Sequence, residues 1–141
     1  MSDILVVSDT NVVISAHHGN ANSPAREIFR RWESGEFTLL YSEDILAEYV
    51  EKLFYFGVPE DLIERFVITL EQNAVYVSID TYHHRKYPVD PDDIAFVLCA
   101  DNGYATDLIS YDQHLLDLQG VYAFDIIRPI EFLQKLREQD L

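Results

Sequence analysis

Residues 6–16, VVSDTNVVISA, place an aspartate directly after a run of β-branched apolar residues. The continuous apolar segment from Ile4 to Ser8 predicts a short strand buried on both faces, as in parallel sheets. Asp9 follows this strand and precedes the segment Asn11 to His17, which predicts a short helix. The acid therefore either caps this helix or holds a cation at the end of the strand, and both interpretations stay open at this point.

Strand and helix patterns alternate along the rest of the chain. Further strands are predicted at 37–41, 74–79, 108–110 and, weakly, 121–124. Helices are predicted over 24–35, after Ser42, over 59–73, after Asp90-Pro91, over 112–118 and after Arg128-Pro129. Such alternation requires right-handed crossovers. We therefore expect an α/β fold, a three-layer α/β/α sandwich with a mainly parallel sheet of about four or five strands.

The composition is that of one globular domain, which we expect to span residues 1–141. With 48% hydrophobic residues, the chain has ample material for a core. The N-terminus lacks the features of a signal peptide, and no run approaches the ~20 apolar residues that span a bilayer. The single cysteine, Cys99, can form no intrachain disulfide. A cytoplasmic protein without membrane partners is the expectation. The net charge of −15 argues against a broad nucleic-acid-binding surface.

Four acids adjoin core-forming residues instead of lying on a solvated face. Asp9 and Asp112 each follow a predicted strand, and parallel sheets place ligands beyond the carboxyl ends of their strands. Asp93 lies in the first turn of an apolar helix, and Glu48 borders the apolar stripe of another. Each has an ordinary alternative when taken singly. The aspartates could cap helices or turns, and Glu48 could pair with Lys52 one helical turn later.

Taken together, the four acids favour a site for a hard cation. Two carboxylates about 5 Å apart repel by roughly 3 kcal/mol at an effective dielectric constant near 20. A cluster of four would raise several pKa values unless a cation neutralised it. Oxygen ligands without the histidine or thiolate spacing of a zinc site indicate Mg²⁺ or Mn²⁺.

The order and spacing of five segments resemble those of the PIN-domain family, and most of all its bacterial group of toxin components from toxin–antitoxin modules. The segments are DTNVVISA, SEDILAEYVEKL, DPDDIAFVLCA, LISYDQHLL and IIRPIEFL. Together they cover almost the whole chain, from about residue 5 to residue 133. The resemblance implies a metal-dependent ribonuclease that hydrolyses RNA phosphodiesters, with Mg²⁺ or Mn²⁺ as cofactor and a compact parallel sheet between helices.

The resemblance also implies residue roles. The acidic quartet of the family would fall on Asp9, Glu48, Asp93 and Asp112, as metal ligands and catalytic residues. Supporting positions around them would be Thr10, Asn11, Ser110, Asp90 and Asp92. Within DPDD, Asp93 is preferred because counting back from Ala100 places it where the third acid of the family stands. A family member of this type is silenced by a small antitoxin protein, and a homodimer is a second possible assembly.

Positive charge is concentrated in two places that could bind RNA. Arg26 and Arg30 lie one turn apart on a predicted helix, whereas His83, Arg85 and Lys86 lie in a loop with tyrosines. A mixture of basic and aromatic groups suits single-stranded RNA. An ordinary solvated surface is the alternative for both patches.

Other function classes stay in view. A PIN-like module with weak catalysis could keep the acids yet act through a protein partner or a homodimer. A phosphotransfer receiver domain has a similar length, but it needs paired acids after its first strand and a late lysine. This chain has only Asp9 at the first position and Asp112 at the second. A dehalogenase-like phosphatase needs a second aspartate where DTN has asparagine.

Overall fold

The computed structural model describes residues 3–80, 87–88 and 90–140. Strands and helices follow each other in the order predicted from the sequence. The strands are β1 (Leu5–Ser8), β2 (Thr38–Tyr41), β3 (Val75–Tyr76), β4 (Asp107–Ile109) and β5 (Asp125–Ile127). The helices are α1 (Thr10–His18), α2 (Pro24–Glu33), α3 (Glu43–Tyr55), α4 (Glu60–Asn73), α5 (Pro91–Asn102), α6 (Gln113–Leu116) and α7 (Pro129–Gln139).

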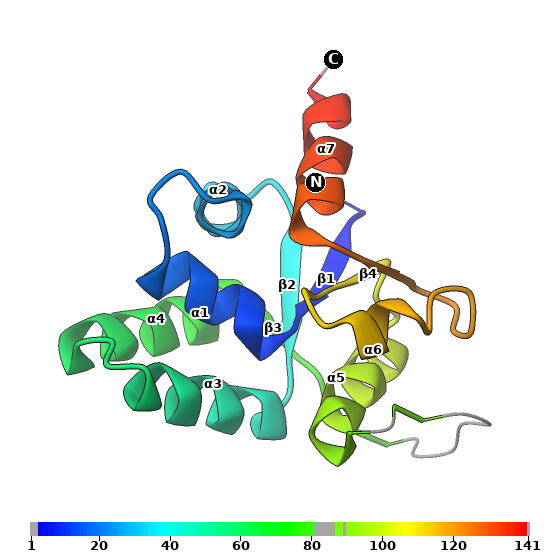
Figure 1. The fold of residues 1–141 in the computed structure, drawn as a ribbon, viewed down its shortest axis with the longest axis horizontal. Helices are drawn as coiled ribbons and strands as arrows, with labels where there is room; N and C mark the ends of the chain where they lie inside the picture. Colours follow the sequence, from blue (N-terminus) through cyan, green and yellow to red (C-terminus); the bar gives the residue numbers. More distant parts are fainter. Residues whose placement is uncertain (1–2, 81–86, 89, 141) are drawn as a thin grey trace.

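The five strands form one sheet in the order β3-β2-β1-β4-β5, and every neighbouring pair is parallel. Helix α5 packs against β1, β2 and β4. Figure 1 shows the sheet between α5 on one side and the helices α1 to α4 on the other. The predicted α/β class with its parallel sheet is therefore confirmed. In the described part of the chain, no helix combines the length and the apolar character needed to cross a bilayer.

Strand β1 occupies the centre of the sheet because its side chains can be buried on both faces. Val6, Val7 and Ser8 are fully shielded from solvent. In the register with β4, Ser8 lies opposite Ile109, so these two strands end at the same level. The residues that follow them, beginning with Asp9 and Ser110, therefore meet at one edge of the sheet.

Two predicted strands differ from those in the structure by more than one residue at an end. The last strand was predicted at 121–124 but forms at Asp125–Ile127, so that prediction is wrong. Pairing with β4 decides the position, because Asp125 lies opposite Asp107 in the parallel register. The predicted strand residues instead fold into a turn, where the rings of Tyr122 and Phe124 stack. The third strand is shorter than predicted and covers only Val75–Tyr76, at the exposed edge of the sheet.

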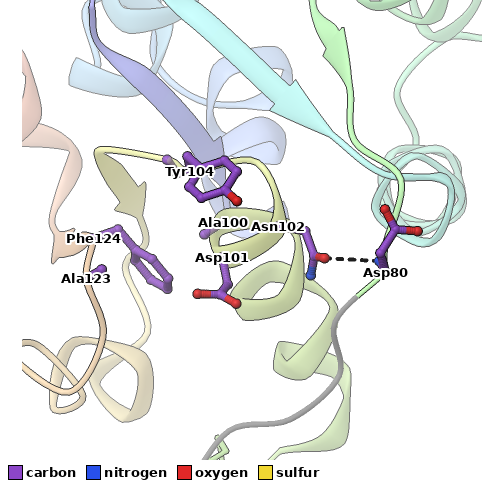
Figure 2. A pocket seen from close by; sticks show the side chains of 8 residues that line it. Asp80, Ala100, Asp101, Asn102, Tyr104, Ala123 and Phe124 are labelled. Carbon is purple, nitrogen blue, oxygen red and sulfur yellow. Dashed lines mark hydrogen bonds between the residues drawn. The ribbon is translucent and has the colours of Figure 1, made fainter.

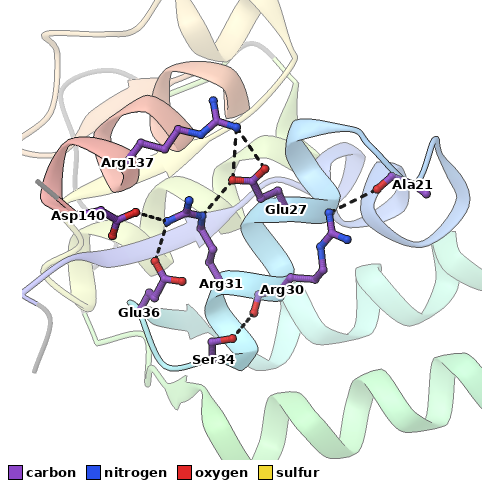
Figure 3. Close-up of polar contacts among 8 residues, drawn as sticks. All are labelled: Ala21, Glu27, Arg30, Arg31, Ser34, Glu36, Arg137 and Asp140. Carbon is purple, nitrogen blue, oxygen red and sulfur yellow. Dashed lines mark hydrogen bonds and ion pairs between the residues drawn. The ribbon is translucent and has the colours of Figure 1, made fainter.

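An arginine cluster joins α2 to the C-terminal helix (Figure 3). Arg31 donates hydrogen bonds to Glu27, Glu36 and Asp140, and Arg137 donates to Glu27. Most of these groups are partly exposed, so each pair adds little to stability. Together these contacts fix α7 beside α2, although the two helices are far apart in the sequence.

A buried ion pair holds α7 on the sheet. Asp107 in β4 is completely buried and accepts hydrogen bonds from Lys135 Nζ, the shorter of them 2.8 Å long. The hydroxyl of Thr106 donates a further hydrogen bond to it. This aspartate lies in β4 itself, before the edge where the strand ends, and its partner is a protein cation. It therefore has a structural role, which the sequence analysis did not assign.

We expect Lys135→Met to lower the free energy of unfolding by roughly 2 kcal/mol, because it leaves a buried carboxylate without its cation. The exposed pair of Arg128 and Glu131 supplies the control, since Arg128→Met should cost under about 1 kcal/mol. Urea denaturation of both variants measures the difference. Equal losses in the two variants would show that the Asp107 pair is not a significant source of stability.

Candidate active site

Four acids from distant parts of the chain line one cleft of about 330 Å³. Asp9 follows β1, Glu48 lies in α3, Asp93 lies in the first turn of α5, and Asp112 follows β4. The same cleft is lined by four of the supporting positions suggested by the sequence, Thr10, Asn11, Asp90 and Asp92. The convergence expected from the ends of parallel strands is therefore the geometry found.

Asp9 combines the two interpretations that its sequence position left open. It is the N-cap of α1, and its Oδ1 accepts a hydrogen bond of 2.7 Å from the backbone N–H of Thr10. Its Oδ2 accepts a second one, 2.6 Å long, from the hydroxyl of Ser110. With 5% of its surface exposed, the side chain is held rigidly at the end of β1 while it still borders the cleft.

Thr10 and Ser110 connect the acids to one another. The hydroxyl of Thr10 donates a hydrogen bond to Glu48, which ties α1 to α3. Ser110 donates to Asp9 and accepts from the backbone N–H of Asp112, which ties the end of β1 to the end of β4. These contacts orient the carboxylates of Asp9 and Glu48 and fix the backbone of Asp112 before any ligand is present.

Further polar groups brace the edges of the cleft. Asp90 caps α5 by accepting from the N–H of Asp92, so it has the capping role that its position suggested. Asn11 accepts a long hydrogen bond of 3.5 Å from the N–H of Tyr111. The sequence analysis missed Tyr49, whose buried hydroxyl donates to the carbonyl of Ser8 and fixes α3 against the end of β1.

Asp93 has a buried carboxylate oxygen that the protein leaves without a hydrogen-bond donor. Its side chain is 7% exposed, and its Oδ2 is, among the described residues, one of two buried side-chain atoms that lack a hydrogen-bond partner. An unsatisfied buried carboxylate oxygen is costly. In this position it borders a cleft that five other carboxylates also line. The arrangement leaves one strong acceptor available to a ligand.

The acids raise one another's pKa values. Burial, opposed by the hydrogen bonds from Ser110 and Thr10, raises the pKa of Asp9 to about 6, and the charges of Glu48 and Asp112 add to the rise. The pKa of Asp93 rises to about 7, first through burial and then through the charges of Asp9, Asp112 and Asp90. Burial also raises the pKa of Glu48. Negative charge is thus concentrated where a cation would relieve it.

The donor set fits a hard divalent cation by its chemistry. All candidate ligands are carboxylate oxygens, and the buried Oδ2 of Asp93 lacks a partner. Such oxygens suit Mg²⁺ or Mn²⁺. Within the described residues, no three histidine, cysteine or acidic side chains form a group that could hold a metal ion as they stand. Binding an ion would therefore require the carboxylates to move closer together.

Two of the basic residues predicted to bind RNA, Arg26 and Arg30, do not line this cleft. Arg26 donates to the carbonyls of Ala16 and Gly19. Arg30 donates to the carbonyl of Ala21 (Figure 3), so both arginines brace the loop between α1 and α2. They line a separate hollow of about 300 Å³. The other predicted patch, His83, Arg85 and Lys86, lies outside the described residues.

Another cavity of about 410 Å³ lies near the opposite end of α5 from Asp93 (Figure 2). Tyr104 and Phe124 line it together with Asp80, whose N–H donates to Asn102. None of the four acids contributes to this cavity. The cleft at the strand ends is therefore the place where the chemistry indicated by the sequence is gathered.

The raised pKa values predict that the metal-free protein loses stability as the pH rises. The folded state holds protons on Asp9 and Asp93 more tightly than the unfolded chain, whose aspartates titrate near 3.8. Their stabilising contribution is complete below that value and is lost as the pH passes about 6 for Asp9 and about 7 for Asp93.

In a chelator, we expect the thermal midpoint to fall between pH 5 and pH 8, and Asp93→Asn to reduce this fall by about 5 °C. Glu64→Gln removes one exposed charge outside the cleft and serves as the control. Thermal unfolding followed by circular dichroism measures all three proteins. An equal fall in the Asp93 variant and in the wild type would contradict the assigned protonation.

Comparison with solved structures supports the fold. A chain in the crystal structure of VapBC2 from Rickettsia felis, bound to a DNA fragment from their promoter, superposes with a TM-score of 0.60. The sequence identity is 11%, and the match covers 89% of this chain and 98% of that chain. Such low identity shows similarity of fold alone. No curated protein matches the chain in sequence.

Comparison with protein families gives a more specific result. The family model described as the PIN domain matches residues 5–114, which is well over half of the chain. The matched region begins at β1 and ends in α6, so it includes all four acids of the cleft. The chain therefore belongs to the PIN-domain family.

Proposed function

We propose that the protein is a metal-dependent ribonuclease that hydrolyses RNA phosphodiesters at the four-acid cleft. One observation carries the proposal: Asp9, Glu48, Asp93 and Asp112 come from four separate elements and line one cleft. Membership of the PIN-domain family supports it, as does the buried, unpaired oxygen of Asp93. A purely structural protein would gain nothing from gathering carboxylates at such electrostatic cost.

The four carboxylates would hold one or two ions of Mg²⁺ or Mn²⁺. Such an ion lowers the pKa of a bound water and stabilises charge on the leaving oxygen of a phosphodiester. The protein's own contribution is to position the ligands. Ser110 and the N–H of Thr10 fix Asp9, and the hydroxyl of Thr10 fixes Glu48. Asp93, with its raised pKa, has to lose its proton before it can act as a ligand, so metal binding should strengthen as the pH rises through about 7.

We further propose that the protein is the toxin component of a toxin–antitoxin module. The support is the similarity of fold to a chain of VapBC2, a protein solved in complex with promoter DNA. The net charge of −15 fits a small basic antitoxin that covers the acidic cleft. A homodimer is the second assembly compatible with this proposal.

The competing function is a PIN-like module with little catalysis that acts through a protein partner or a homodimer. The acidity of the chain favours this alternative, because a surface of the same sign as RNA weakens substrate binding. The two functions differ in one measurable respect. Only the ribonuclease cleaves RNA in a reaction that depends on both the metal and the cleft acids.

We expect Asp9→Asn and Glu48→Gln each to lower Mn²⁺-dependent cleavage of a labelled RNA at least about 100-fold, because each removes a proposed metal ligand. Glu51→Gln is the matched control, since this exposed acid lies on the same helix as Glu48 but outside the cleft. Circular dichroism checks that the variants remain folded. Full activity in either cleft variant would contradict the ligand assignment, and an inactive wild type would favour the binding module.

A further inference from the structure

We propose that Lys52, Tyr55 and Phe56 form a binding wall that holds single-stranded RNA beside the acids. The proposal rests on the proposed function, because the wall borders the same cleft. It adds the residues outside the acidic quartet that would contact the substrate. Arg26 and Arg30, the described members of the basic patches suggested by the sequence, do not line the cleft.

The position of these residues on α3 brings them to the cleft. Glu48, Lys52 and Phe56 are spaced by four residues, so they lie on one face of the helix and its C-cap. All three line the cleft. Among the described residues that line it, Lys52 is the sole lysine or arginine. A phosphate that approaches the acids therefore meets one positive group, one helical turn from Glu48.

The aromatic rings beside Lys52 are exposed to an unusual degree. Tyr55 is 76% exposed and Phe56 is 46% exposed. Their ring centroids lie 5.1 Å apart with an interplanar angle of 87°, and Lys52 Nζ lies 5.9 Å from the centre of the Tyr55 ring. The three side chains thus form one contiguous surface, at the distance of a cation–π contact.

This combination matches the chemistry of an unpaired nucleotide. Proteins that bind single strands use aromatic rings to stack bases and a cation to contact the backbone. Stacking tolerates any sequence, because every base has a π-face. In a duplex the bases already stack on one another and their faces are inaccessible. Tyr55 and Phe56 can therefore engage a single strand but offer little to a helix of the same sequence.

Three arginines of α2 are engaged in contacts outside the cleft. Arg26 and Arg30 bond to backbone carbonyls of the loop after α1. Arg31 is held by three carboxylates of the cluster that joins α2 to α7 (Figure 3). Lys52 has a different setting, since it borders the cleft and faces an aromatic ring.

A neighbouring aromatic residue, Phe54, lies outside this wall. Phe54 is 63% exposed, but it lines a different groove between α3 and α4, with Val50 and Ile63. Glu51, Glu60 and Glu64 line that groove too, so its charge disfavours phosphates. Phe54 is therefore a matched control: it is equally aromatic, lies two residues from Phe56 and is absent from the cleft lining.

The test measures binding of a labelled, short, mixed-sequence RNA by fluorescence anisotropy in Mn²⁺. Every protein compared carries Asp9→Asn, so that the RNA is not cleaved, and gels check that it stays intact. We expect Phe56→Ala to raise the Kd for the single strand about tenfold, and Phe54→Ala less than twofold. Lys52→Met should weaken binding and reduce the dependence of log K on log salt by about one unit, with recovery in Lys52→Arg. The protein with Asp9→Asn alone should bind the duplex of the same sequence at least about tenfold more weakly than the single strand.

The thermal shift caused by Mn²⁺ separates this wall from the metal site, because it should be the same in the wild type, Phe56→Ala and Phe54→Ala. Tyr55→Ala, at a highly exposed position, replaces Phe56→Ala if that variant does not fold. Equal single-strand affinity in the Phe54 and Phe56 variants overturns the proposal, and so does tight duplex binding. If Phe56→Ala and Phe54→Ala both bind RNA as tightly as the protein without these changes, the rings are not part of an RNA-binding surface.

The outcomes also separate this proposal from the proposed function. A wild type that binds the single strand through Phe56 but cleaves nothing would support the wall and contradict the ribonuclease. If the wild type and Phe56→Ala both cleave RNA with the same KM, the result would support the ribonuclease and contradict the wall.

Discussion

The burial of the Asp9 carboxylate at the end of the central strand is the constraint around which the site is built. Both oxygens accept hydrogen bonds, one from the start of α1 and one from Ser110 beyond β4. The side chain is therefore tied to the two central strands of the sheet at once. This anchoring turns a flexible acid into a fixed point, and the other carboxylates are positioned relative to it. Thr10 extends the connection to Glu48, and Ser110 extends it to Asp112.

A cost in electrostatic energy accompanies this arrangement. The raised pKa values of Asp9, Glu48 and Asp93 all have burial as their first cause and neighbouring carboxylates as a further one. Asp107 gives an instructive contrast within the same sheet. It is also fully buried, but Lys135 neutralises it, so it contributes to stability instead of chemistry. In place of such a cation, Asp9 and Glu48 have hydroxyl and N–H donors, and one oxygen of Asp93 has no partner, which leaves these acids available to a ligand.

Sequence reasoning predicted much of the fold, because its signals were local and strong. Prolines at helix starts, the serine caps of α2 and α3 and the apolar run of β1 were sufficient to place most elements. The last strand was misplaced because residues 121–124 have high β propensity, whereas the register with β4 selected Asp125–Ile127. Arg26 and Arg30 were correctly paired on one helix face, but their local role in bracing a loop was not visible in the sequence.

The sequence by itself determined that Asp9 and Asp112 would each follow a strand of a mainly parallel sheet and so project from the same edge, whereas the tertiary structure decided that these strands, β1 and β4, are neighbours. It also determined that Glu48 and Asp93 would border the core. Glu48 lies beside the apolar stripe of an amphipathic helix, and Asp93 lies in the first turn of a helix that is apolar nearly all round. Only the tertiary structure decided that Asp93 keeps an unpaired oxygen and that Lys52 and Phe56 share the cleft. The physical reason is that hydrogen bonds and cleft walls depend on how α3 and α5 pack across the sheet. That packing joins residues far apart in sequence, and no local pattern records it.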